Sequence, residues 1–72
     1  MTLNITTSSR NVPYYATVIN TADHESTLDM VREYCTETDI QISDIPDHEI
    51  EYIEEYVKGS INKYDQVFFW FD

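Results

Sequence analysis

The chain has 72 residues and a formal net charge of −10, because fourteen Asp and Glu residues stand against four Lys and Arg residues. This length supports one domain, residues 1–72. Such a charge repels phosphate, which argues against direct binding to nucleic acid or to an anionic membrane. The natural complement is a basic surface on another protein.

Hydrophobic residues make up 42% of the chain and aromatic residues 14%, which favours a folded core over a disordered chain. Cys35 is the only cysteine, so no internal disulfide forms and a reducing compartment is expected. The N-terminal residues lack a signal-peptide pattern, and no apolar run approaches the ~20 residues that span a membrane. We therefore expect a cytoplasmic protein with no membrane partner.

Two short strands are predicted in the first twenty residues, where Arg10 is the one charged side chain. Residues 3–7 alternate and are rich in β-branched side chains, and residues 14–19 have a similar β-forming composition. Residues 8–13 between them are polar and are expected to form a loop. The two strands are predicted to pair as an antiparallel hairpin.

A first helix is predicted over residues 26–36, with Ser26 and Asp29 as its capping pair. Apolar residues recur inside it at helical spacing, so one face should lie against the core. That stripe consists of Leu28, Val31 and Cys35, flanked by Met30 and Tyr34. The isoleucines that follow are expected to form a short extended segment that fills the core: Ile40, Ile42 and Ile45.

A second helix is predicted from Pro46, which suits a first helical position, to about Lys58. Gly59, the only glycine, is expected to form a left-handed cap at its C-terminal end. Residues 66–71 predict a final strand that is apolar on both faces and therefore well buried, or partly an interaction surface. The order β-β-α-α-β predicts an α+β fold, a small antiparallel three-stranded sheet with two helices packed on one face.

Acidic side chains recur at every fourth position of both predicted helices and form one row on each. Neighbours in such a row lie about 5–6 Å apart between Cβ atoms and destabilise the helix by about 0.2–0.5 kcal/mol per pair. Only Arg32 and Lys58 lie near enough in sequence to relieve this repulsion. The rows consist of Glu25, Asp29, Glu33 and Glu37 on the first helix, and of Asp47, Glu51 and Glu55, with Glu54 beside them, on the second.

Two interpretations of these rows stay open. In one, the regular negative charges imitate the phosphates of a nucleic-acid strand and occupy a groove lined with Lys and Arg. In the other, they form a solvated face that only keeps the protein soluble. Tyr52 and Tyr56 lie one turn apart beside the acids, where they either stack on partner Arg side chains or line the edge of the core.

Catalytic and metal-binding patterns are not convincing in this sequence. His24 and His48 each precede a glutamate, but neither has the second His four residues later that a zinc-protease motif needs. Cys35 lies on the apolar stripe among acids that would raise its pKa, so it is interpreted as a core residue. We therefore predict that the protein is not an enzyme and uses no cofactor or metal.

In size, charge and element order the chain resembles small acidic anti-CRISPR proteins of phages that act as DNA mimics. The resemblance covers the opening MTLNITTSSRNVPYYATVI, the acidic helices and the final strand. It implies a monomer or small homo-oligomer in the bacterial host cytoplasm that binds the basic DNA-binding or PAM-reading surface of a type I CRISPR effector complex and blocks target DNA. The alternative is an adaptor or antitoxin-like module that binds by edge pairing through its aromatic C-terminal strand.

Overall fold

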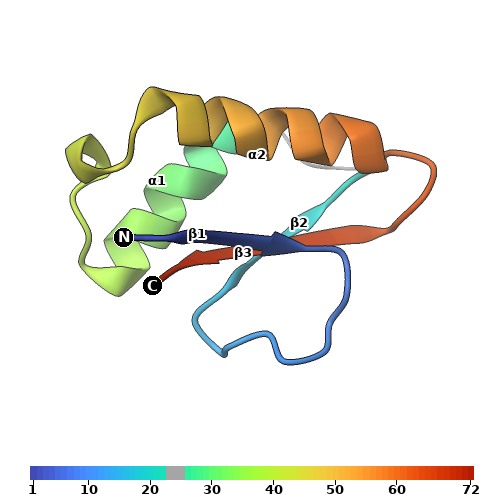
Figure 1. Ribbon diagram of the computed structural model, residues 1–72, viewed down its shortest axis with the longest axis horizontal. Helices are drawn as coiled ribbons and strands as arrows, with labels where there is room; N and C mark the ends of the chain where they lie inside the picture. Colours follow the sequence, from blue (N-terminus) through green and yellow to red (C-terminus); the bar gives the residue numbers. More distant parts are fainter. Residues whose placement is uncertain (23–25) are drawn as a thin grey trace.

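Three antiparallel strands form one sheet, and two helices cover one of its faces, in the computed structural model, which describes residues 1–22 and 26–72 (Figure 1). This arrangement confirms the predicted α+β class and element order. The elements are β1 (Leu3–Thr6), β2 (Thr17–Asn20), α1 (Thr27–Thr38), the 3-10 helix η1 (Ile42–Asp44), α2 (Asp47–Ser60) and β3 (Gln66–Phe71).

The C-terminal strand β3 lies in the middle of the sheet, in the order β1-β3-β2. Both N-terminal strands pair with it, so that Ile5 and Thr17 lie on either side of Phe69. The predicted hairpin between the first two strands is therefore wrong, and a strand that is apolar on both faces takes the protected central position instead. Because β3 has no free edge, the edge pairing with a partner expected for this strand is not available to it.

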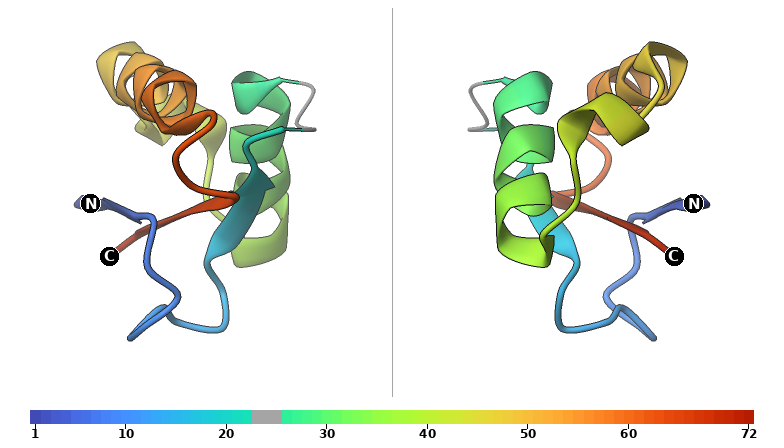
Figure 2. Two further views of the ribbon diagram at one scale, coloured as in Figure 1. Left: turned by 90° about the vertical axis from the view of Figure 1, so that its right-hand side faces the viewer. Right: turned by 90° about the vertical axis from the view of Figure 1, so that its left-hand side faces the viewer.

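The core lies between β3 and the two helices. Val67, Phe69 and Phe71 point toward the helices and are at most 4% exposed, as the alternation of the strand predicts. They pack against Val31 and Tyr34 of α1 and against Ile53 and Val57 of α2. By the same alternation, Phe68 and Trp70 point to the opposite face of the sheet. The loop between β1 and β2 lies on that side (Figure 2).

Helix α1 begins as predicted, because the Ser26 hydroxyl accepts a hydrogen bond from the Asp29 backbone N–H at 3.4 Å. Its buried stripe is shifted from the expected one. Leu28 is 38% exposed, whereas Tyr34 is 1% exposed and faces the core with Val31 and Cys35. The Tyr34 ring can lie in the core because its hydroxyl has hydrogen-bonding partners on β3, whereas Leu28 lies on the exposed side of the helix.

That partner is the backbone of Phe71. β2 begins at Thr17, opposite Phe69, so the N–H and C=O of Phe71 have no strand to pair with on that side of β3. The Tyr34 hydroxyl accepts a hydrogen bond from the Phe71 N–H at 2.9 Å and donates one to its C=O at 3.3 Å. One side chain thus satisfies both groups of a buried strand residue.

The segment between the helices contains the 3-10 helix η1 where an extended segment was expected. Ile45 fills the core, Ile40 is partly buried, and Ile42 is 37% exposed. α2 then starts directly after Pro46 and continues through Gly59, which has no positive φ, so the predicted left-handed glycine cap is wrong. The left-handed position after α2 falls on Asn62 (φ 71°), and the buried Ser60 hydroxyl donates a hydrogen bond to the Tyr56 carbonyl at 2.9 Å.

Candidate interaction surface

The acidic rows lie on the solvent sides of the two helices, away from the buried stripes. Every member in the described part of the chain is exposed: Asp29, Glu33 and Glu37 on α1, and Asp47, Glu51, Glu54 and Glu55 on α2. Glu25, the predicted first member of the α1 row, lies outside the described residues. On either helix, residues four apart are separated by about 6 Å along the axis.

Two cations lie beside these rows, at the positions expected from the sequence. Arg32 contacts Asp29 at 3.8 Å, and Lys58 contacts Glu54 at 3.3 Å and Glu55 at 3.8 Å. All of these side chains are at least half exposed, so each pair contributes only ~0–1 kcal/mol to stability. Within residues 1–22 and 26–72, no salt bridge is formed by Glu33, Glu37, Asp47 or Glu51.

Negative charge is concentrated on the helical side of the molecule. Residues 26–60, which form both helices and their connection, contain ten acids and two Lys or Arg residues, a net charge of −8. Residues 1–22, which form β1, β2 and the loop on the other side of the sheet, contain Arg10 as their only charged side chain. The molecule therefore has a strongly negative side and a nearly neutral side.

The two predicted tyrosines lie together on α2, with ring centroids 6.2 Å apart at an interplanar angle of 47°. Tyr52 is 54% exposed and available to a partner, whereas Tyr56 is half-buried and packs against the core. The position of Tyr52 thus fits the interpretation as a partner contact, and the position of Tyr56 fits the interpretation as the edge of the core. Tyr52 presents an open ring, and Tyr56 supports it from the edge of the core.

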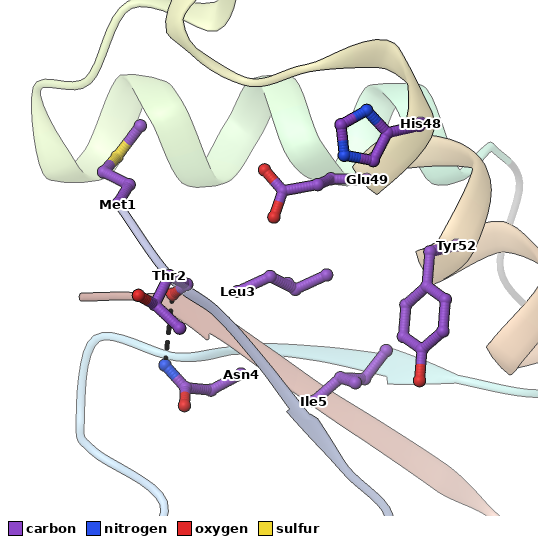
Figure 3. A pocket seen from close by; sticks show the side chains of 8 residues that line it. All are labelled: Met1, Thr2, Leu3, Asn4, Ile5, His48, Glu49 and Tyr52. Atoms are coloured by element: carbon purple, nitrogen blue, oxygen red, sulfur yellow. Dashed lines mark hydrogen bonds between the residues drawn. The ribbon is translucent and has the colours of Figure 1, made fainter.

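A groove of about 690 Å³ lies between β1 and the start of α2 (Figure 3). Residues 1–5 form one wall, and His48, Glu49 and Tyr52 extend toward it from α2. Glu49 was not among the predicted site residues, because it belongs to neither acidic row. No local pattern indicates this groove, since it depends on β1 taking an edge position beneath α2.

The reactive groups outside the acidic rows include, among the described residues, the Cys35 thiol and the possible metal ligands. Burial, and secondarily the Asp44 carboxylate, raise the pKa of the Cys35 thiol, which makes it a poor nucleophile at neutral pH. In the part of the chain that the structure describes, no three His, Cys, Asp or Glu side chains are grouped to hold a metal ion. Neither helix there has the length and apolar character that crossing a membrane requires.

Comparisons with known proteins add no relative to this description. A scan of protein-family models, a search of curated proteins and a search of solved structures each found no match.

Proposed function

We propose that the protein is an inhibitor that imitates DNA and occupies the basic nucleic-acid-binding surface of another protein. The observation that carries this proposal is the run of exposed carboxylates on the outer sides of α1 and α2, most of them without a cationic neighbour in the described residues. A face that served solubility alone would be expected to intersperse both signs of charge. In this chain, neighbouring carboxylates in each row repel one another, and few cations are placed to reduce that repulsion.

The physical basis is electrostatic complementarity. A groove that binds DNA presents Lys and Arg at the spacing of phosphates, and carboxylates repeated about 6 Å apart along a helix offer those cations alternative partners. The helical side carries a net charge of −8, and its long-range electric field would raise the rate of association with a basic surface. That rate would fall as salt screens the charges. Tyr52 would add contact area at the flank of the α2 row, where its exposed ring can stack on a partner Arg.

The resemblance to small acidic anti-CRISPR proteins selects the first partner to test. We propose the DNA-binding or PAM-reading surface of a type I CRISPR effector complex, and inhibition by exclusion of target DNA. Salt-sensitive capture of a basic protein tests binding to such a surface, and identification of the captured protein tests whether the surface belongs to a CRISPR effector complex.

The test is capture of partners from a host lysate at low and at high salt, followed by their identification. The bait is the wild-type chain beside two variants of equal net charge, Glu51→Lys/Glu55→Lys in the α2 row and Asp65→Lys/Asp72→Lys outside both rows. We expect the row variant to weaken inhibition of the captured partner by well over about ten-fold, because each reversal replaces an attraction with a repulsion. Equal activity of the two variants would contradict the proposal.

A further inference from the structure

β1 is an edge strand whose outward backbone groups are in register for another strand. Thr2 and Asp72 exchange both backbone hydrogen bonds at 3.0 Å. In an antiparallel ladder such pairs alternate with pairs that do not bond each other, so Asn4 and Thr6 also bond to β3. The N–H and C=O groups of Leu3 and Ile5 therefore point away from β3, toward the open edge.

This open edge forms one side of the groove beneath α2. The groove is long enough to include residues 1–5, and its other wall is the first two turns of α2 (Figure 3). In the side view, β1 is the outermost strand and α2 lies above it (Figure 2). A segment that added to β1 would thus have backbone partners along one side and the side chains of α2 above it.

Charge determines which segment fits. Among the described residues that line the groove, Glu49 is the only acid and His48 is the only basic side chain. Glu49 is half-buried, and no salt bridge holds it in the described part of the chain. Tyr52 presents its ring beside it, and a ring face attracts cations. A second copy of this chain carries the same net charge of −10, so the two copies repel each other as they approach, whereas a basic segment would be attracted to the molecule and would neutralise Glu49.

We propose that this groove binds an extended basic peptide segment of a partner protein, which adds to the sheet as a fourth strand beside β1. The backbone of the segment bonds to Leu3 and Ile5, and every second side chain points toward α2, where Lys or Arg reaches Glu49 and Tyr52. The site goes beyond the proposed function, because it lies on the β1 side of α2 and contains none of the acids in the two rows; Tyr52 alone borders both surfaces.

The probe is a synthetic peptide of alternating Val and Lys, compared with alternating Val and Glu and with a Val-Lys peptide N-methylated at every second amide. Hydrogen exchange of the Leu3 and Ile5 amides, followed by NMR, reports strand addition directly. We expect the Val-Lys peptide alone to slow exchange at both amides by about ten-fold or more. No slowing with Val-Lys, or equal slowing with either control peptide, would overturn the proposal.

A matched pair of variants separates the groove from general charge attraction. Glu49→Gln and Glu33→Gln each remove one negative charge, the first inside the groove and the second on α1. We expect Glu49→Gln to weaken the Val-Lys complex about five-fold, the upper end for a partly exposed ion pair, and Glu33→Gln to leave it nearly unchanged. Equal weakening by both variants would show diffuse attraction and refute the site, without bearing on the rows tested by Glu51→Lys/Glu55→Lys.

Discussion

Replacing Tyr34 with Phe deletes one oxygen atom from the core, and the fold should depend strongly on that atom. The Tyr34 hydroxyl bonds both the N–H and the C=O of Phe71, and Tyr34 is 1% exposed, so water cannot replace it. Phe fills the same volume, which means that the change removes hydrogen bonds without creating a large cavity.

The magnitude follows from the two groups left without a partner. A buried donor or acceptor that loses its partner costs about 1–3 kcal/mol. The bond from the Phe71 N–H is short at 2.9 Å and the bond to its C=O is longer at 3.3 Å, so the first should dominate. We therefore expect Tyr34→Phe to lower the free energy of unfolding by about 2 kcal/mol. A domain of this length has only ~4–11 kcal/mol in total.

Urea denaturation followed by circular dichroism measures this loss. With a slope of about 1 kcal/mol per molar urea, the midpoint should fall by about 2 M. Tyr56→Phe is the matched control, because the Tyr56 hydroxyl forms no hydrogen bond within the described residues, and it should change stability by less than about 0.5 kcal/mol. Equal stability of the two variants would refute the assigned role of the Tyr34 hydroxyl.

Three further predictions concern the helices and the thiol. Gly59→Ala should raise the free energy of unfolding by about 0.5–1 kcal/mol, because Gly59 is helical and an added Cβ would meet no atom within 4 Å. Destabilisation in a urea titration would contradict this and would indicate a left-handed backbone at Gly59. Glu51→Lys should stabilise the fold by about 0.5 kcal/mol at low salt, because it relieves repulsion with Asp47 and Glu55; a gain that persists in 1 M salt, at about 3 Å screening length, would contradict this origin. The raised pKa of Cys35 means that the unfolded thiol ionises first, so stability should fall as pH rises above the ordinary thiol pKa; Cys35→Ser in parallel pH titrations should lack that component, and identical alkaline profiles would contradict it.

Much of the local structure was predictable because it depends on neighbours in sequence. β3 was predicted over residues 66–71 because its β-propensity is high throughout. α1 was predicted because Ser26 supplies an N-terminal cap and because Val31 and Cys35 follow the helical spacing of apolar residues. The exposure of the acidic rows follows from the same period. Their partners Arg32 and Lys58 lie three or four residues away, so these contacts were predictable too.

The errors arise where distant residues compete. β1 and β2 were expected to pair with each other because they are consecutive, yet both gain more by pairing with β3, which buries its apolar side chains on both faces. Tyr34 is buried with a hydroxyl partner 37 residues away, a contact that no local pattern in the sequence indicates, and Leu28 is left on the exposed side of α1. The groove beside Glu49 was missed for the same reason, since the edge position of β1 is a property of the whole sheet.

The most direct test of the central claim is competition between this protein and DNA for the captured partner. The partner is held with a labelled DNA duplex, and the protein is titrated at several salt concentrations. We predict complete displacement of the duplex, with an inhibition constant that rises steeply with salt because both ligands use the same cations. A ternary complex in which the partner keeps its DNA while the protein is bound would contradict the proposal that the two acidic rows occupy the site of a polyanion.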